Sequence, residues 1–273
     1  MTSHRIGICS WSLQPIHCAD LVSKTKQTDI SALQLGLGPI ISGEWSLDEC
    51  TDRLGDARID ILSGMMGTKG EDYTTLETIR KTGGIRPDEH WSTNLETSRA
   101  AADIAAELGL ELVTFHAGFI PEGSNDRERS VMLDRLATLG GIFENVGIKL
   151  GLETGQEKAG VLLDVLQDLR CPTVGVNFDP ANMILYGMGN PTEALDALAE
   201  YVFQIHIKDA TPTDAPGTWG AEVVVGTGSV DWSRFLAIHE ERIGCDLCIE
   251  REAGNNRIED IRTAHRLLIG DTE

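Results

Sequence analysis

The chain has 273 residues, of which 41% are hydrophobic and 24% charged, and its formal net charge at pH 7 is −20. These values suit one large α/β domain or two small ones in a globular protein. The excess of acidic residues argues against nucleic acid or an anionic membrane as a partner, because both are bound through Lys and Arg. No run is apolar enough to span a bilayer, no signal-peptide region precedes the first strand, and the six cysteines are scattered, so a cytoplasmic protein is expected.

In chain order the sequence predicts alternating strands and helices, assigned from apolar runs, capping residues and Gly or Pro breaks. They are strand 5–10, helix 18–28, strand 32–37, a helix capped by Ser46, strand 59–65, helix 93–108, strand 110–117, helix 125–146, strand 148–154, helix 156–169, strand 174–180, a helix from 190, strand 201–208, helix 231–242, strand 245–251 and helix 257–269.

The alternation is interrupted once, by the polar and Gly-rich segment at about 66–92. A long insertion after the C-terminal end of a strand is typical of a functional lid, and the alternative is a disordered tip. Tyr73, His90 and Trp91 favour a segment that packs.

Eight strands that alternate with helices at this length predict a single-domain (β/α)8 barrel over residues 1–273, with the lid inserted into it. The alternative, a doubly wound open sheet, usually carries a Gly-rich nucleotide turn after its first strand. Residues 7–12 contain no such turn.

Four of the expected strands have an ionisable residue at or near the C-terminal end: Glu153, Asp179, His206 and Glu250. Each one alone suits a helix cap or a salt bridge. In a barrel, however, all of these ends lie on one face, and a buried carboxylate is costly unless it is paired or coordinates a metal. The four residues therefore predict an oxygen-rich site for one divalent ion.

The chain resembles the sugar-phosphate isomerase/epimerase family of xylose-isomerase-like TIM barrels over nearly its whole length. The motifs that carry the resemblance are Leu152-Glu153, Asp179-x-x-Asn182, His206-Ile-Lys208-Asp209, Gly226-x-Gly228-x-Val230-Asp231-Trp232 and Ile249-Glu250. In that family the matching Glu, Asp, His and Glu bind one Mn²⁺, Mg²⁺, Co²⁺ or Zn²⁺ ion. The two glutamates also exchange a substrate proton in its ketose 3-epimerase branch.

The resemblance implies a role in carbohydrate metabolism: a metal-dependent isomerase or epimerase that acts on a small sugar, keto-sugar or polyol by proton transfer next to a carbonyl. A homo-oligomer is a possible assembly. Three positions depart from the ketose epimerases, namely Asn182, Pro212 and Ala159, although Gln156 or Glu157 could substitute for the glutamate replaced by Ala159. The Lys208-Asp209 pair is more similar to the inosose dehydratase and hydroxypyruvate isomerase side, so a metal-dependent lyase or dehydratase is the alternative.

Two other classes compete with these. An endonuclease-IV-like DNA repair enzyme needs a zinc cluster with extra histidines and a basic groove, which seven histidines and a charge of −20 do not suit. The second class is a non-catalytic sugar-binding barrel. The missing epimerase residues favour it, and the intact set of four ligand-type residues argues against it.

Glu153 and Glu250 are the expected acid–base pair. The expected substrate-binding residues are His116, Asn182, Lys208, Trp11 and Gln156. The alternatives are packing beside Phe115 for His116, and an ion pair with Asp209 or Glu153 for Lys208. Trp11, Trp45 and Trp219 are expected in loops on the active face, where an aromatic ring suits a sugar C–H face.

Overall fold

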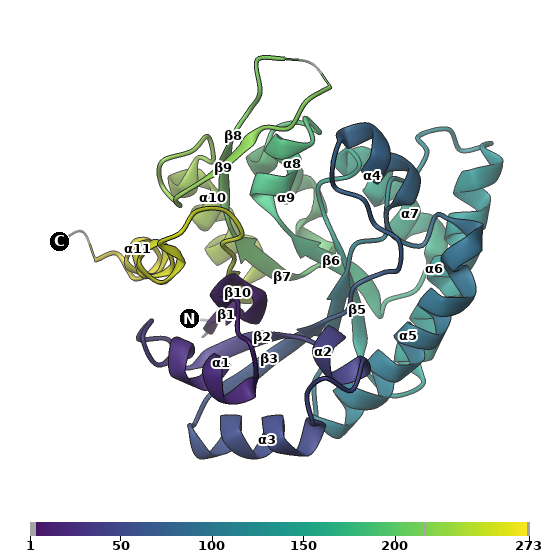
Figure 1. The fold of residues 1–273 in the computed structure, drawn as a ribbon. Helices are drawn as coiled ribbons and strands as arrows, with labels where there is room; N and C mark the ends of the chain where they lie inside the picture. The colour runs from purple at the N-terminus through teal and green to yellow at the C-terminus, as the bar shows by residue number, and fades with distance from the viewer. Residues whose placement is uncertain (1–3, 216, 272–273) are drawn as a thin grey trace.

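The computed structural model describes residues 4–215 and 217–271, and within them eight parallel strands close into a barrel (Figure 1). Neighbouring strands follow the order β1-β10-β7-β6-β5-β4-β3-β2, which confirms the predicted (β/α)8 barrel. The barrel strands are β1 (Ile6–Cys9), β2 (Ala32–Gly36), β3 (Asp60–Met65), β4 (Leu112–Phe115), β5 (Lys149–Glu153), β6 (Val174–Phe178), β7 (Val202–Ile207) and β10 (Asp246–Ile249).

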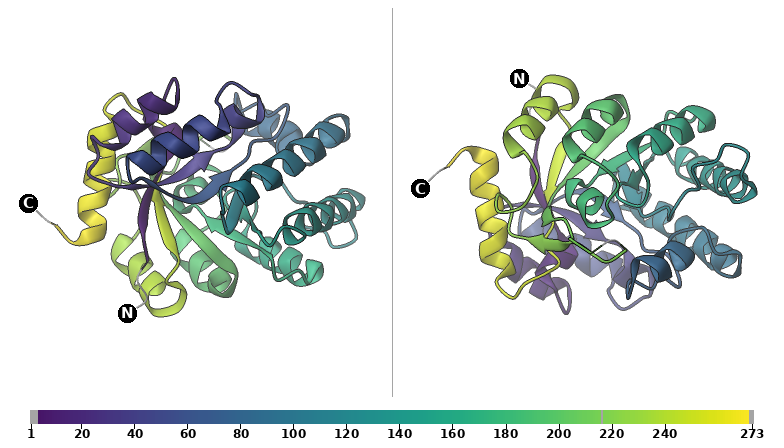
Figure 2. Two further views of the ribbon diagram at one scale, coloured as in Figure 1. Left: turned by 90° about the horizontal axis from the view of Figure 1, so that it is seen from below. Right: turned by 90° about the horizontal axis from the view of Figure 1, so that it is seen from above.

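Helices surround the barrel, and the C-terminal helix packs beside the N-terminal segment (Figures 1 and 2). They are α1 (Cys18–Thr25), α2 (Gly38–Ile41), α3 (Leu47–Asp56), α4 (Leu76–Thr82), α5 (Asp88–Glu107), α6 (Arg127–Glu144), α7 (Ala159–Leu169), α8 (Pro180–Leu185), α9 (Pro191–Leu198), α10 (Trp232–Ile238) and α11 (Arg257–Ile269). No helix in the described part of the chain is long and apolar enough to cross a membrane.

The inside of the barrel is partly polar. Side chains alternate along an extended backbone, so Gln204 and His206 of β7 share one face, as do Asn177 of β6 and Asp179, which directly follows this strand. Gln204 Nε2 donates to Asn177 Oδ1 (3.2 Å), and Gln204 Oε1 accepts from the Ser63 hydroxyl (2.6 Å). This buried network supports the side chains at the C-terminal ends of the strands, where the ligand-type residues lie.

The inserted segment differs from the sequence prediction. Helix α5 begins at Asp88 rather than at Thr93, so the inserted segment ends near residue 87, and it contains the unpredicted helix α4. Trp91 belongs to α5, where its ring lies 5.1 Å from the guanidinium carbon of Arg135. Pro87 is the N-cap residue of α5, so the helix begins earlier than the polar composition of this stretch indicated.

A second unpredicted element is the antiparallel pair β8 (Asp209–Thr211) and β9 (Ala221–Val223), which follows β7 at the top of Figure 1. Asp209 fastens the loop behind it: its carboxylate accepts hydrogen bonds from the backbone N–H groups of Gly226, Gly228 and Val230 and from Trp232 Nε1. A Cβ on Gly228 would lie 2.1 Å from Asp209 Oδ1, so only glycine permits this approach. The motif at 226–232 is therefore a structural anchor for the active face.

Candidate metal centre and active site

The four ligand-type residues converge as the sequence predicted. Glu153 ends β5, Asp179 follows β6, His206 is the penultimate residue of β7 and Glu250 follows β10, so they come from four successive strands of the barrel. One ligand atom from each lies within 4.8 Å of every other, and all four residues are buried.

This group fits a divalent cation. Asp179 Oδ2 and His206 Nδ1 are buried and have no hydrogen-bond partner among the described residues. His206 Nδ1 lies 3.5 Å from Glu153 Oε1, 3.8 Å from Asp179 Oδ2 and 3.4 Å from Glu250 Oε2. Three carboxylates this close repel one another in a buried site, and three oxygens plus one imidazole nitrogen suit Mg²⁺, Mn²⁺, Co²⁺ or Zn²⁺.

Buried amide side chains fix the orientation of the His206 ring. Its Nε2 lies 2.6 Å from Gln34 Oε1 and 3.0 Å from Asn177 Nδ2, and these two contacts turn Nδ1 toward the carboxylates. Burial alone would lower the pKa of His206, but the surrounding anionic groups, among them Glu153 and Glu250, raise this pKa well above its ordinary value. Gln34 of β2 is a residue that sequence reasoning missed, because a glutamine inside an apolar strand carries no ligand-type signal.

Glu153 is held by two predicted substrate-binding residues. Asn182 Nδ2 donates to Glu153 Oε1 (2.9 Å), and His116 Nε2 lies 3.5 Å from the same oxygen. Burial opposes ionisation of Glu153, but His116 and His206 outweigh it and lower the pKa of this carboxyl. Asn182 approaches this closely because residue 155 is Gly155, where a Cβ would lie 2.4 Å from the Asn182 Cβ.

Glu250 has a different environment. Trp11 Nε1 donates to Oε1 (2.7 Å), and the Lys208 ammonium donates to Oε2 (2.9 Å). Lys208 also donates to Glu252 Oε2 (2.6 Å) and lies 3.7 Å from Asp179 Oδ2. Lys208 therefore pairs with Glu250 and Glu252 rather than with Asp209 or Glu153, the partners of the predicted alternative. Burial raises the pKa of Glu250, but Lys208 and His206 hold it well below its ordinary value.

Asp179 also caps a helix. Its Oδ1 accepts the backbone N–H of Asn182 at the start of α8 (2.9 Å), which leaves Oδ2 facing the centre. Burial raises the pKa of Asp179 to about 6, although Lys208 and His206 act in the opposite direction.

Two adjoining cavities open from this centre. One, of about 300 Å³, includes Asn182, Lys208 and Trp219 in its lining, and the other, of about 290 Å³, includes Trp11 and Glu250. Both are lined by Tyr73, His116 and Glu252. Tyr73 belongs to the inserted segment, so this segment forms part of the wall of the site. Trp45 does not belong here: it is 8% exposed and packs in the main apolar core, contrary to expectation.

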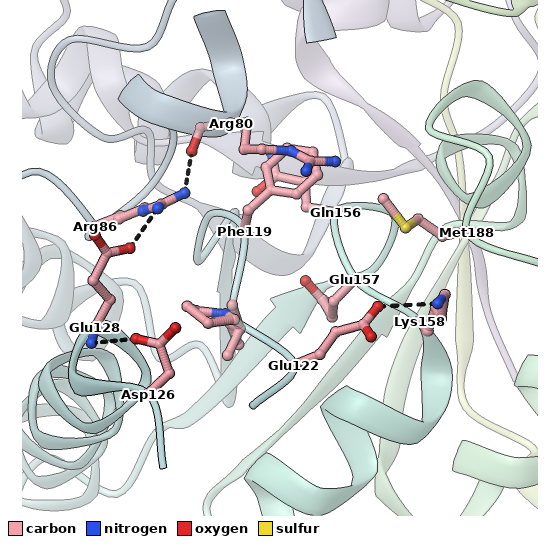
Figure 3. Close-up of a pocket in the computed structure, with 12 residues that line it drawn as sticks. Arg80, Arg86, Phe119, Glu122, Asp126, Glu128, Gln156, Glu157, Lys158 and Met188 are labelled. Carbon is pink, nitrogen blue, oxygen red and sulfur yellow. Dashed lines mark hydrogen bonds and ion pairs between the residues drawn. The ribbon is translucent and has the colours of Figure 1, made fainter. Parts of the chain in front are cut away.

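Gln156 faces a separate cavity of about 310 Å³ (Figure 3). It is buried, and its Nε2 lies 3.4 Å from Tyr186 Oη, so it supports a wall of the metal-site cavity from behind. Its neighbour Glu157 points into the cavity of Figure 3 and is 7% exposed, and burial raises its pKa to about 8. Neither side chain belongs to the metal group.

Comparison with known proteins identifies the family. The model of the family described as "Xylose isomerase-like TIM barrel" matches residues 47–269. The crystal structure of a xylose isomerase domain protein from Planctomyces limnophilus is 32% identical, with 91% of each chain covered and a TM-score of 0.84.

The uncharacterized protein MJ1311 of Methanocaldococcus jannaschii is 28% identical over 176 residues, which are 60% of this chain and 57% of that protein. The uncharacterized protein YihM of Escherichia coli is 26% identical over 150 residues, which are 52% of this chain and 46% of that protein. The chain thus spans about half the length of the curated relatives it matches.

More distant solved structures share the fold. A xylose isomerase-like TIM barrel protein from Mycobacterium smegmatis in complex with magnesium is 16% identical, with a TM-score of 0.74 over 99% of this chain and 98% of that one. A D-allulose 3-epimerase from Methylomonas sp. in complex with D-allulose is 14% identical, with a TM-score of 0.72 over 98% and 97%. The probable 3-DHS dehydratase AsbF from Bacillus anthracis is 15% identical, with a TM-score of 0.72 over 98% and 99%. On the family model and the Planctomyces structure, the chain belongs to the xylose isomerase-like TIM barrel family.

Proposed function

We propose that the protein is a divalent-metal-dependent isomerase or epimerase, which acts on a sugar, keto-sugar or polyol by proton transfer next to a carbonyl. The observation that carries the proposal is the placement of two buried glutamates, Glu153 and Glu250, in one group with Asp179 and His206. Two glutamates in one centre provide the base and the acid that such a proton transfer requires.

Glu153, Asp179, His206 and Glu250 would hold the ion. When bound, Mn²⁺, Mg²⁺, Co²⁺ or Zn²⁺ polarises a substrate carbonyl and stabilises negative charge on its oxygen. The magnesium complex of the Mycobacterium smegmatis protein supports a divalent ion in this fold.

The hydrogen bonds support different roles for the two glutamates. Both oxygens of Glu250 accept strong bonds, from Trp11 Nε1 at 2.7 Å and from Lys208 Nζ at 2.9 Å. Among the described residues, Glu153 Oε2 has only a long contact with Asn177 Nδ2, at 3.4 Å. Glu153 is therefore the better placed group to take the proton from carbon. Glu250, which lies next to the Lys208 ammonium, would be the group that returns a proton to the substrate.

His116, Asn182 and Trp11 would bind the substrate. His116 Nδ1 is buried and has no hydrogen-bond partner among the described residues, and the His116 side chain lines both cavities. Asn182 lines one cavity and fixes Glu153, and Trp11 lines the other and fixes Glu250. Each of these side chains would thus orient a glutamate and contact the substrate.

The segment 66–87 would act as a lid over the centre. It contributes Thr68, Glu71 and Tyr73 to the cavity lining, and Tyr73 is 44% exposed at the boundary between the two cavities. A lid of this kind shuts out water and completes the site around a bound substrate.

The test is solvent exchange. Protein loaded with Mn²⁺ is incubated in D₂O with a panel of ketoses, aldoses and polyols, and NMR follows deuterium entering the carbon next to the carbonyl. We expect exchange with at least one sugar, and loss of exchange in Asp179→Asn and after chelation. Absence of exchange from a metal-loaded protein that binds a sugar would instead establish the non-catalytic sugar-binding barrel.

A metal-dependent lyase or dehydratase is the second candidate, and the buried Lys208 ammonium favours it. Lys208 lies between Glu250 and Glu252 and lines the same cavity as Asn182, so it could supply the proton that a departing hydroxyl requires. Mass spectrometry of the same incubations separates the two reactions, because a dehydratase product has lost one water and an isomerase or epimerase product has not.

A further inference from the structure

Cys9 lies at the inner edge of the metal centre. It is the last residue of β1, which pairs with β10, and β10 in turn pairs with β7. Glu250 follows β10 and His206 is on β7, so Cys9 extends the ring of ligand-type residues by one more strand around the barrel. Its side chain is fully buried, in an inward-facing cluster with Ala32, Leu62 and Cys248.

Cys9 completes a second donor group. Its Sγ, a ring nitrogen of His206 and a carboxylate oxygen of Glu250 all lie within 4.8 Å of one another. The thiol donates a weak hydrogen bond to Gln34 Oε1 at 3.4 Å. The same Gln34 oxygen lies 2.6 Å from His206 Nε2, so Cys9 and the imidazole both contact it.

We propose that the centre has a second, overlapping metal position formed by Cys9, His206 and Glu250, which takes a thiophilic divalent ion such as Cd²⁺ or Zn²⁺. His206 and Glu250 belong to both positions, so one chain holds an ion in the four-donor group or in the Cys9 group, not in both. The second position stands on the placement of Cys9, and only its consequence for catalysis rests on the proposed function.

The two positions should prefer different ions, because one contains a soft sulfur donor and the other mainly hard oxygen donors. Thiolate sulfur selects thiophilic ions, whereas carboxylate oxygens suit Mg²⁺ and Mn²⁺. Binding at the second position forms a sulfur–metal bond and breaks the Cys9 S–H bond, and the proton leaves to solvent. An ion in this position withdraws Glu250 and His206 from the four-donor group, so Cd²⁺ should inhibit an enzyme that Mn²⁺ activates.

The test uses cadmium alone, added to the metal-free full-length protein. Bonding of thiolate to Cd²⁺ produces a charge-transfer absorption in the ultraviolet, which is absent for oxygen and nitrogen donors. We expect the absorption to saturate at one Cd²⁺ per chain and to be lost in Cys9→Ser. Cys248→Ser is the matched control, because Cys248 is equally buried in the same cluster but belongs to neither donor group, and it should retain the absorption.

Asp179→Asn separates this proposal from the proposed function. Asp179 belongs only to the four-donor group, so this variant should lose Mn²⁺ binding and keep the cadmium absorption. The proposal is overturned if no absorption develops, or if the absorption persists in both Cys9→Ser and Cys9→Ala while circular dichroism shows both variants folded. Failure of the wild type to bind Mn²⁺ would count against the proposed function alone.

Discussion

Replacement of Glu250 by glutamine should remove turnover while leaving the protein folded. General acid–base groups contribute about 10²–10⁴-fold in rate, which corresponds to about 3–5 kcal/mol of transition-state free energy. Breaking a buried ion pair outright costs about 3–5 kcal/mol of unfolding free energy. In Glu250→Gln the Lys208 ammonium retains Glu252 at 2.6 Å and lies 3.7 Å from Asp179, so the loss of stability should be smaller than the loss of catalysis.

The assay compares exchange with product formation. If Glu153 takes the proton from carbon, Glu250→Gln should still exchange deuterium into the substrate without forming product. Glu153→Gln should abolish both the exchange and the product formation. Glu157→Gln is the control, since it makes the same change in a buried carboxyl outside the metal group. Turnover within tenfold of wild type in Glu250→Gln at saturating metal would refute the assignment of Glu250.

Three further outcomes are expected. Mn²⁺ at about 100 times its Kd should raise the unfolding free energy by about 2.7 kcal/mol, and a Tm shift equally large in Asp179→Asn would contradict the ligand set. Tyr73→Ala should raise KM several-fold with little change in Tm, because Tyr73 lines both cavities and is 44% exposed; unchanged kinetics would remove the lid role. Folded protein keeps a proton on Glu157 up to a pKa of about 8, against an ordinary value of 4.5, so wild-type stability should fall as pH rises through that window. Glu157→Gln should flatten this dependence in urea titrations, and an unchanged slope would show that Glu157 is not the group responsible.

The position of each donor along its strand could be predicted from sequence because side chains alternate with a period of two. This period places His206 of β7, and Asp179 directly after β6, on the inward face. The C-terminal ends of the strands meet at one face once the barrel closes, so local pattern and fold class together bring the four residues to one place. The C-terminal boundary of the inserted segment could not be predicted in the same way, because composition does not show that Asp88 begins a helix.

The hydrogen-bond and ion-pair partners of long polar side chains depend on where their end groups lie in the folded protein. Local sequence patterns do not encode these positions. Lys208 is adjacent to Asp209 in sequence, yet its ammonium binds Glu250 and Glu252. Gln156 follows Glu153 closely, but the chain turns at Gly155 and directs the amide to Tyr186.

The sequence by itself determined the barrel, its eight strands and the four residues that converge at their ends, because strand period and strand–helix alternation are local properties that a closed parallel barrel converts directly into position. Only the tertiary structure decided that Gln34 orients His206, that Lys208 engages Glu250, and that Cys9 adjoins the metal group. These contacts join β1, β2, β7 and β10, and their geometry exists only after the barrel has closed.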